Sequence, residues 1–394
     1  MKENLKKCKK NLLLISLIIF LNNINLYNVV AILYYKSITN SFVLGMSIFS
    51  ITTISSAIFE LPTGIISDKI GRKKTIVYGS SCSVLSAIIL FLANNYYLLI
   101  LFAIINGIEM AFFSGNNDAY VYDNLCMINN KEKYINSIGK VKSMEYLAGA
   151  ISGLIGAGLL YCFSYKLIIG ISIIPKVIQL VISLFLKAIK NNETNTNSNK
   201  KLIKGALKES LENKLLLKKV LYDGILQSTN ESCYQFRSAF YETVWPIWAI
   251  GIPGILSNIG AFISNWCSEK LISKTSRKKY WFLSHSYSMF SNTIAVITNN
   301  IISPIIMISN SLFHSDFIDS EIEQKLYKDE YRASMGSIKS FIQSILFAVF
   351  SVILGLIADY FNIVTSFIIF QLINIIPIIM NSKIIENVEK NYKN

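Results

Sequence analysis

Two glutamates stand alone inside long apolar runs, where a carboxyl group could carry a proton. Glu109 lies near the middle of one run, and Glu231 lies near the middle of another. An ionisable side chain at bilayer depth costs about 2.5–3.5 kcal/mol, so each glutamate needs a reason to be there. Apolar surroundings favour the protonated form of a carboxyl group, so either could load and release a proton. The alternative is a protonated or hydrogen-bonded glutamate that only fixes helix packing.

Polar side chains recur at helical spacing around both glutamates and in the first apolar run. The candidates for solute or proton binding are Asn22, Asn25, Glu109, Asn117, Gln227, Glu231, Tyr234 and Arg237. Arg237 has three possible roles that the sequence leaves open: it neutralises Glu231, meets an anionic substrate, or lies at the outer boundary of the membrane.

About twelve apolar runs must position these residues, and a membrane helix needs roughly 20 such residues. The chain has 394 residues and is 52% hydrophobic and 16% charged, whereas soluble proteins carry about 25% charged residues. The runs lie near 11–33, 41–66, 75–93, 97–120, 140–162, 166–187, 219–240, 247–267, 280–297, 300–317, 337–357 and 362–381. Those near 219–240 and 280–297 are the least hydrophobic.

The net charge of +14 could indicate nucleic-acid binding, but its distribution indicates a membrane topology instead. With these twelve helices, all but four of the 38 Lys and Arg fall in the termini and in every second loop. This alternation follows the positive-inside rule and places both termini in the cytoplasm. A nucleic-acid surface would not avoid alternate loops, so nucleic acid is excluded as a partner.

A polar segment divides the twelve helices into two sets of six. Residues 191–199 are low in complexity and are expected to be disordered. The basic amphipathic stretch 200–219 is expected to lie on the inner membrane face. We therefore predict an N-terminal six-helix bundle over residues 1–187, a cytoplasmic linker over 188–218, and a C-terminal six-helix bundle over 219–394.

The loop after the second helix carries a short charged turn with the pattern Gly64-x-x-x-Asp68-x-x-Gly71-Arg72-Lys73. Gly71 permits a tight or left-handed turn. Asp68 can accept from backbone N–H groups at a neighbouring helix start, and Arg72 can pair with Asp123 at the inner end of the fourth helix. A weaker copy without the glycines lies near 268–279, which favours duplication of a six-helix unit.

The sequence Glu60-Leu61-Pro62-Thr63-Gly64, running into this turn, resembles the signature loop of the major facilitator superfamily. More narrowly, it resembles a bacterial branch described as drug or multidrug exporters. Residues 114–123 and 330–334 are similar to that branch at the end of its fourth helix and at its tenth-to-eleventh junction. The residues that match the gating motif are Glu60, Gly64, Asp68, Gly71, Arg72 and Asp123.

The resemblance implies an all-α membrane protein with 12 transmembrane helices. These form two six-helix bundles related by pseudo-twofold symmetry, around a cavity that opens alternately to each side. It also implies that Asp68 caps the eleventh helix near residues 334–337 and that Arg72 pairs with Asp123, which together would latch the outward-open state. One departure concerns the fifth helix, because proton-coupled drug exporters carry a Gly-Pro motif there. Residues 149–158 of this chain are rich in glycine and have no proline.

The leading functional hypothesis is secondary active transport across the cell membrane, with a small amphipathic solute exported as protons enter. The open alternatives are a nutrient uptake symporter, a membrane-embedded lipid-modifying enzyme and a non-transporting sensor. Only His314 with Asp316 resembles a catalytic pair, and no phosphate-binding loop for a pump exists. We therefore expect no enzyme activity, cofactor or metal. The expected partners of a monomer in the bilayer are a small-molecule substrate and protons or another coupling ion.

Overall fold

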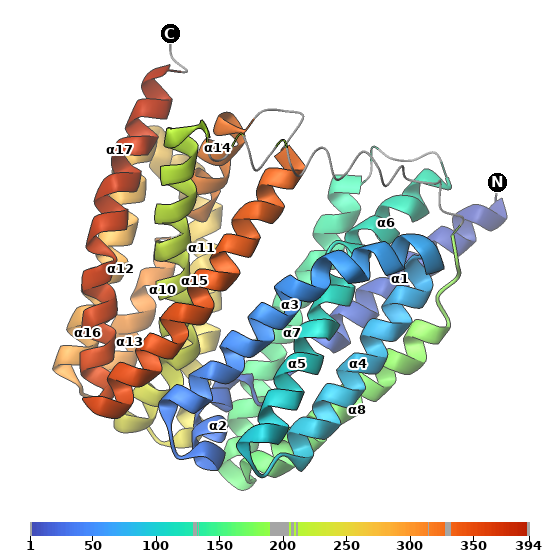
Figure 1. Ribbon diagram of the computed structural model, residues 1–394, viewed down its shortest axis with the longest axis horizontal. Coiled ribbons are helices and arrows are strands. Elements are labelled where there is room, and N and C mark those ends of the chain that lie inside the picture. Colours follow the sequence, from blue (N-terminus) through green and yellow to red (C-terminus); the bar gives the residue numbers. More distant parts are fainter. Residues whose placement is uncertain are drawn as a thin grey trace. The chain divides into compact units, whose positions relative to one another are not determined.

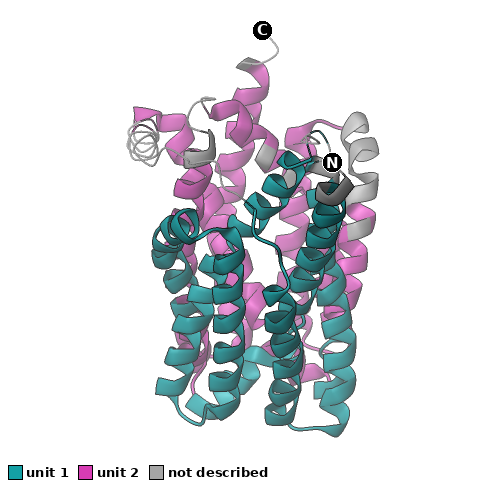
Figure 2. Ribbon diagram, turned by 90° about the vertical axis from the view of Figure 1, so that its right-hand side faces the viewer, with its two compact units in different colours: residues 1–40, 51–194, 247–251 teal, residues 41–50, 195–246, 252–394 magenta. Residues whose placement is uncertain are grey.

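The computed structural model describes residues 2–128, 132, 134–189, 205, 209, 212–313, 315–327 and 332–391, and every regular element in these ranges is a helix. The chain forms two compact units, which have separate colours in Figure 2. Unit 1 comprises residues 1–40, 51–194 and 247–251, and unit 2 comprises 41–50, 195–246 and 252–394. Each unit includes one short segment from the other half of the sequence. Residues 247–251 belong to unit 1 and residues 41–50 to unit 2, whereas the predicted division is a single cut near the linker.

Unit 1 is a bundle in which α4 packs against both α5 and α8, and α1 packs against α7 and α8 (Figure 1). Its helices are α1 (Lys2–Asn22), η1 (Asn28–Val30), α2 (Ala31–Thr39), α3 (Phe42–Ile70, from residue 51 on), α4 (Arg72–Leu92), α5 (Tyr96–Phe113), α6 (Asn116–Cys126), α7 (Tyr134–Cys162), α8 (Tyr165–Leu184) and η3 (Ile247–Ala249). A fully buried apolar cluster that includes Ile15, Ile18 and Ile76 joins α1 to α4. The apolar residues that predicted membrane helices therefore also form the interior of the bundle.

Unit 2 is organised around its longest helix, α10, which packs against α15, α16 and α17 (Figure 1). Its helices are α10 (Lys214–Val244), α11 (Ile252–Lys274), α12 (Arg277–Thr298), α13 (Ser303–Ile308), η4 (Ser309–Leu312), α14 (Asp316–Leu326), α15 (Arg332–Tyr360), α16 (Ile363–Ile373) and α17 (Ile375–Asn391). Trp281 is fully buried in an apolar cluster with Ile318, Ile322 and Ile385, which holds α12, α14 and α17 together.

Several predicted continuous helices are interrupted in the described structure, among them the first, fourth, eighth, tenth and twelfth. The first ends at Asn22 and resumes at residue 28, and the fourth breaks between α5 and α6. Gly115 at the second break has φ +64°, a left-handed conformation that suits glycine. The tenth is divided into α13, η4 and α14, and the twelfth into α16 and α17. Irregular backbone is tolerated at membrane depth where protein or a polar cavity satisfies it.

Seven helical segments in the described part are long and apolar enough to cross a membrane. They are Phe42–Ile70, Arg72–Leu92, Tyr96–Cys126, Ser137–Cys162, Tyr165–Leu184, Met335–Tyr360 and Ile363–Lys390. Three of the other five predicted spans fall short for visible reasons. Lysines crowd the start of α1, α10 carries several charges, and the tenth predicted helix consists of short pieces. Most of the predicted linker 188–218, including the low-complexity stretch, lies outside the described residues.

Candidate functional site

Glu109 is held in the interior of unit 1 by hydrogen bonds from uncharged groups. It lies on α5, and its side chain is only 3% exposed. Its Oε2 accepts from Ser86 Oγ on α4 and from Asn106 Nδ2, each at 3.2 Å. Within the described residues no lysine or arginine forms an ion pair with it. A buried carboxylate usually has such a partner because isolated charge is costly in an apolar interior.

Lys176 of α8 is also buried in unit 1, and it binds a backbone carbonyl instead of a carboxylate. Its Nζ donates to the carbonyl oxygen of Asn22, the last residue of α1. Helix ends leave carbonyls without an intrahelical partner, so the interruption of the first helix creates this acceptor. The charges of Lys176 and Glu109 are close enough to interact electrostatically.

Two serines of α4 bind the two ends of this site: one binds Asn22, the partner of Lys176, and the other binds Glu109. Ser83 Oγ donates to Asn22 Oδ1 at 3.3 Å, while Ser86 bonds Glu109. We call Asn22, Ser83, Ser86, Glu109 and Lys176 the Glu109 site. The carboxyl group and the ammonium group of this site each form hydrogen bonds with uncharged groups and not with one another. Lys176 could therefore change its partner when the carboxyl group gains or loses a proton.

The structure places Asn25 and Asn117 near the helix interruptions of unit 1. The backbone N–H of Asn25 donates to Ser152 Oγ of α7 at 3.2 Å, and its side chain donates to the Asn22 carbonyl at 3.4 Å. Asn117 lies on α6, just beyond Gly115, and its buried Oδ1 has no hydrogen-bond partner. Asn22 and Asn25 therefore gather at the end of α1, whereas Asn117 is separated from Glu109 by the break in the fourth helix.

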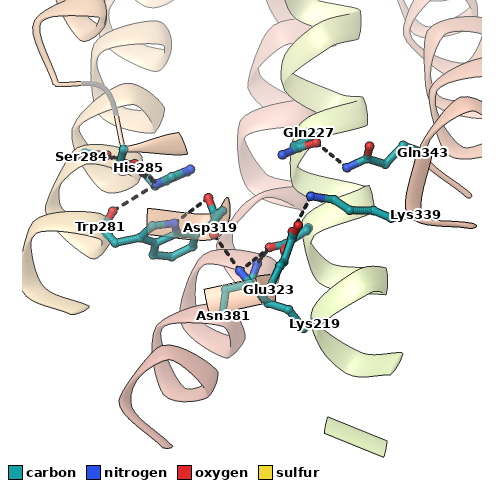
Figure 3. A network of polar contacts seen from close by, with 12 residues as sticks. Lys219, Gln227, Trp281, Ser284, His285, Asp319, Glu323, Lys339, Gln343 and Asn381 are labelled. Atoms are coloured by element: carbon teal, nitrogen blue, oxygen red, sulfur yellow. Dashed lines mark hydrogen bonds and ion pairs between the residues drawn. The ribbon is translucent and has the colours of Figure 1, made fainter. Parts of the chain in front are cut away.

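The polar stripe of α10 in unit 2 is exposed, in contrast to Glu109. Gln227, Glu231 and Tyr234 are all exposed, and Tyr234 is exposed by 56%. Gln227 bonds Gln343 of α15, shown in Figure 3, while Glu231 Oε1 accepts from Gln235 Nε2 at 2.7 Å. A polar face of this kind can meet a solute directly.

Arg237 lies over the aromatic ring of Tyr234 and forms no ion pair with Glu231 in the described structure. Its guanidinium carbon lies 5.5 Å from the centroid of the Tyr234 ring, and its buried Nε has no hydrogen-bond partner. No ion pair joins Arg237 to Glu231 in the described structure. Its positive charge beside an aromatic ring is available for an anionic or polar group of a solute.

The predicted gating motif forms a hydrogen-bonded corner between α3 and α4. Gly71 links them with φ +91°, as its predicted left-handed turn requires. Arg72 pairs with Asp68 at 3.1 Å and donates to Ser67 Oγ at 2.9 Å. Ser67 in turn donates to Asn116 Oδ1 at 2.7 Å, and Asn116 Nδ2 donates to the Arg72 carbonyl. The corner is thereby fastened to the start of α6.

One pairing in the motif differs from expectation, and the surroundings of Glu60 and Gly64 complete its description. Arg72 takes Asp68 as its ion-pair partner and leaves Asp123 without one in the described structure, because the turn brings the i and i+4 side chains together. Glu60 accepts from Ser114 Oγ at 3.0 Å, next to the break in the fourth helix. A Cβ added at Gly64 would meet nothing within 4 Å, so no close helix approach explains that glycine within its unit.

Several residues of the sequence-based account lie wholly or partly outside the described structure. His314 is not described, nor are the side chains of Asp316, Ser334 and the second loop copy at 268–274. The catalytic pair of His314 with Asp316 and the capping of residues 334–337 by Asp68 therefore stay predictions. His285, the other histidine, stacks on Trp281 with ring centroids 4.1 Å apart, and its Nδ1 lies 3.1 Å from the Trp281 carbonyl oxygen.

A buried charge network in unit 2 was missed by sequence reasoning. Lys219 of α10 is completely buried, and its Nζ contacts Asp223 Oδ1 at 2.8 Å and Asp319 Oδ1 at 2.6 Å (Figure 3). Glu323 of α14 pairs with Lys339 of α15. The available signals were the i, i+4 spacings of Lys219 with Asp223 and of Asp319 with Glu323. These residues lie beside predicted loops, where charge is ordinarily solvated, so no local pattern predicts their burial.

The chain matches the model of a known protein family and is similar to several known transporters. The model of the Major Facilitator Superfamily matches residues 12–315. The chain is 28% identical over 169 residues to an uncharacterised transporter of Buchnera aphidicola, covering 43% of this chain and 41% of the relative. It is 33% identical over 130 residues to an uncharacterised MFS-type transporter of Methanocaldococcus jannaschii, covering 31% of each. The matches thus span about two fifths or less of these curated relatives.

A solved structure is similar along nearly the whole chain. It is a bacterial homologue of the human lysosomal transporter Spinster, in an inward-facing and unoccupied conformation. The TM-score is 0.78, the sequence identity is 13%, and 98% of each chain is covered. At this identity the likeness establishes the fold alone. The extent of the family match and the all-helical transporter fold lead to one conclusion: the chain belongs to the major facilitator superfamily.

Proposed function

We propose that the protein is a proton-coupled exporter of a small amphipathic solute, with Glu109 as its coupling carboxylate. The observation that carries the proposal is the burial of Glu109 with two uncharged donors and no ion pair. In the described structure Lys176 donates to the Asn22 carbonyl, and in the proposed cycle it keeps this partner while Glu109 is protonated. Loss of the proton creates a negative charge for which Lys176 is the available counterion. A change of partner by Lys176 would then connect proton release to the end of α1.

The exposed stripe of α10 supports a solute surface for the same function. Gln227 and Glu231 offer hydrogen bonds, while Tyr234 and Arg237 offer an aromatic face and a cation. Such a combination suits compounds with both apolar and polar parts. The charge distribution of the loops supports a multi-pass cell-membrane protein with both termini in the cytoplasm. Export, as opposed to uptake, is supported by the resemblance of the Asp68 loop to that of exporters.

The proposal is tested with purified protein in liposomes. A panel of amphipathic antibiotics and dyes is first screened for compounds that raise the melting temperature. A hit is then loaded into liposomes with a trapped pH dye, and its movement is followed under an imposed proton gradient. The wild-type protein should move the compound against the proton flux. Glu109→Gln should abolish the response to the gradient, because glutamine keeps a side-chain acceptor but cannot ionise.

Glu145→Gln is the matched control, since it makes the same change at an exposed carboxylate of α7 in the same unit. It should retain coupled transport. Transport that ignores the proton gradient in the wild-type protein and persists unchanged in Glu109→Gln would contradict the proposal. Co-migration of solute and protons would identify uptake by symport instead of export.

A further inference from the structure

Five charged side chains meet in the interior of unit 2, and their charges do not balance. We call Lys219, Asp223, Asp319, Glu323 and Lys339 the Lys219 cluster (Figure 3). They come from α10, α14 and α15, and each has little or no exposed side-chain surface. Among the residues whose side chains the structure describes, two ammonium groups face three carboxyl groups. If all five were ionised, one negative charge would remain in an interior where an uncompensated charge is strongly unfavourable.

Two of the carboxylates have the partners that an ionised group requires. Glu323 is paired with Lys339. Asp319 Oδ1 lies 2.6 Å from Lys219 Nζ, and its Oδ2 accepts from Trp281 Nε1 at 2.9 Å. Both oxygens of Asp319 are thus satisfied by donors, as the ionised form prefers. These two pairs account for both ammonium charges.

Asp223 is the carboxyl group left over, and only one of its oxygens is satisfied. Its Oδ1 accepts from Lys219 Nζ and from Asn381 Nδ2, both at 2.8 Å. Its Oδ2 is buried, and no described residue forms a hydrogen bond with it. Asn381 of α17 is 0% exposed, and its amide Oδ1 is likewise buried without a hydrogen-bond partner among the described residues. An unsatisfied buried acceptor is unfavourable, and here two such acceptors belong to residues that already share one hydrogen bond.

A single proton resolves the charge excess and the missing hydrogen bonds together. A protonated carboxyl group gains a donor while its other oxygen continues to accept. If Oδ2 of Asp223 carries the proton, it can donate to Oδ1 of Asn381 while Nδ2 of Asn381 donates to Oδ1 of Asp223. The two side chains then form a closed acid–amide pair. The cluster becomes neutral, with two ion pairs and one uncharged acid.

We propose that Asp223 binds a proton in the interior of unit 2 and shares it with Asn381. Tyr327 and His285 are further titratable groups near the cluster in the described structure. Tyr327 contacts Glu323 Oε2 at 3.5 Å, and His285 stacks on Trp281. The proposal concerns unit 2 alone and does not rest on proton-coupled transport by Glu109.

Infrared spectroscopy of the purified full-length protein tests for this proton directly. A protonated carboxyl group absorbs in a region separate from carboxylates, and its band shifts in heavy water. Near neutral pH, Asp223→Asn should remove one such band, whereas Glu109→Gln should leave that band in place. A spectrum of Asp223→Asn that keeps the whole protonated-carboxyl absorption of the wild-type protein would overturn the proposal.

Thermal unfolding of two matched variants provides a second test that needs no transport. Asp223→Asn replaces a neutral acid by a neutral amide and should lower the melting temperature only slightly. Asp319→Asn makes the same change at the other carboxyl group on Lys219, and it should lower the melting temperature by more than about 5 °C because an ion pair is lost. Equal losses, or a larger loss or failure to fold in Asp223→Asn, would show that Asp223 is ionised.

Discussion

The two units bury charge in different ways. In unit 1, Glu109 and Lys176 are each bound by uncharged groups and form no ion pair with one another. In unit 2, Lys219 contacts two carboxyl groups directly, and Lys339 pairs with a third. A carboxylate and a cation that are held apart can change partners at small cost, whereas a direct pair resists separation. The difference favours coupling in unit 1 and a fixed scaffold with a bound proton in unit 2.

Removal of Lys219 should have the largest effect on stability. Lys219→Met leaves carboxyl groups buried without their cation and should lower the free energy of unfolding by about 3–5 kcal/mol. Thermal unfolding in detergent, followed by tryptophan fluorescence, measures the loss. The double variant Lys219→Met/Asp319→Asn should recover part of it because the second change removes the uncompensated charge. If Lys219→Met melted at the same temperature as the wild-type protein, the ion pairs of Lys219 would not stabilise unit 2, and the proposed difference between the two units would be wrong.

Close packing beside the end of α1 should have the next largest effect. A Cβ added at Gly156 of α7 would lie 2.4 Å from the Leu26 carbonyl oxygen, whereas one added at Gly158 meets nothing within 4 Å. Gly156→Ala should therefore destabilise the protein by about 1–3 kcal/mol. Because Leu26 follows the Asn22 carbonyl that binds Lys176, the same variant should also disturb coupling at Glu109. Gly158→Ala is the matched control on the same helix, and an equal effect of both variants would contradict the packing described.

Removal of Lys176 should cost less than removal of Lys219. Lys176→Met loses the hydrogen bond to the Asn22 carbonyl and also relieves the burial of an ammonium group, so the loss should be at most about 1.5 kcal/mol. The same unfolding measurement compares it with Lys219→Met. If both variants lose equal stability, Lys176 is ion-paired after all and the partner exchange proposed for Glu109 is wrong.

The surface ion pair between α12 and α14 should have the smallest effect. Arg277 Nε lies 2.8 Å from Glu321 Oε2, and both side chains are more than a third exposed. Arg277→Ala should therefore cost about 0.2–1 kcal/mol, less at high salt. Partial burial alone would raise the pKa of Glu321, but hydrogen bonds from Lys325 and Arg277 outweigh it and lower the pKa.

The contribution of this pair should depend on pH with a defined sign. A lowered pKa in the folded state means that stabilisation is present above the unfolded-state pKa and is lost as the pH falls through the folded-state pKa. The difference in stability between the wild-type protein and Arg277→Ala should therefore shrink in acid. A difference that grows in acid would contradict the lowered pKa of Glu321.

The sequence was sufficient for the family and for most helices because both depend on local patterns. Apolar runs, alternating loop charge and the Gly71 turn are all visible within short windows. The interruptions were not predictable in the same way, because hydropathy averages over a break at a single residue such as Gly115. The burial of Glu109 followed from its apolar run, but its bond to Ser86 depends on how α4 packs against α5.

Partners that lie far apart in the chain were beyond sequence reasoning. Lys219 and Asp319 are 100 residues apart, and both lie beside segments whose charge suggested solvent. Arg72 was assigned to Asp123, whereas the local turn gives it Asp68. For Lys219 the choice among several oppositely charged partners is made by tertiary packing, which a single sequence does not contain, whereas Arg72 is paired by its local turn.

Proton release on ligand binding tests the central claim most directly. A compound found by thermal shift is added to purified protein in weakly buffered detergent solution, and the released protons are counted with a pH dye. The wild-type protein and Asp223→Asn should both release a proton near neutral pH, and Glu109→Gln should release none while still binding the compound. Undiminished release from Glu109→Gln would show that the coupling proton is carried elsewhere.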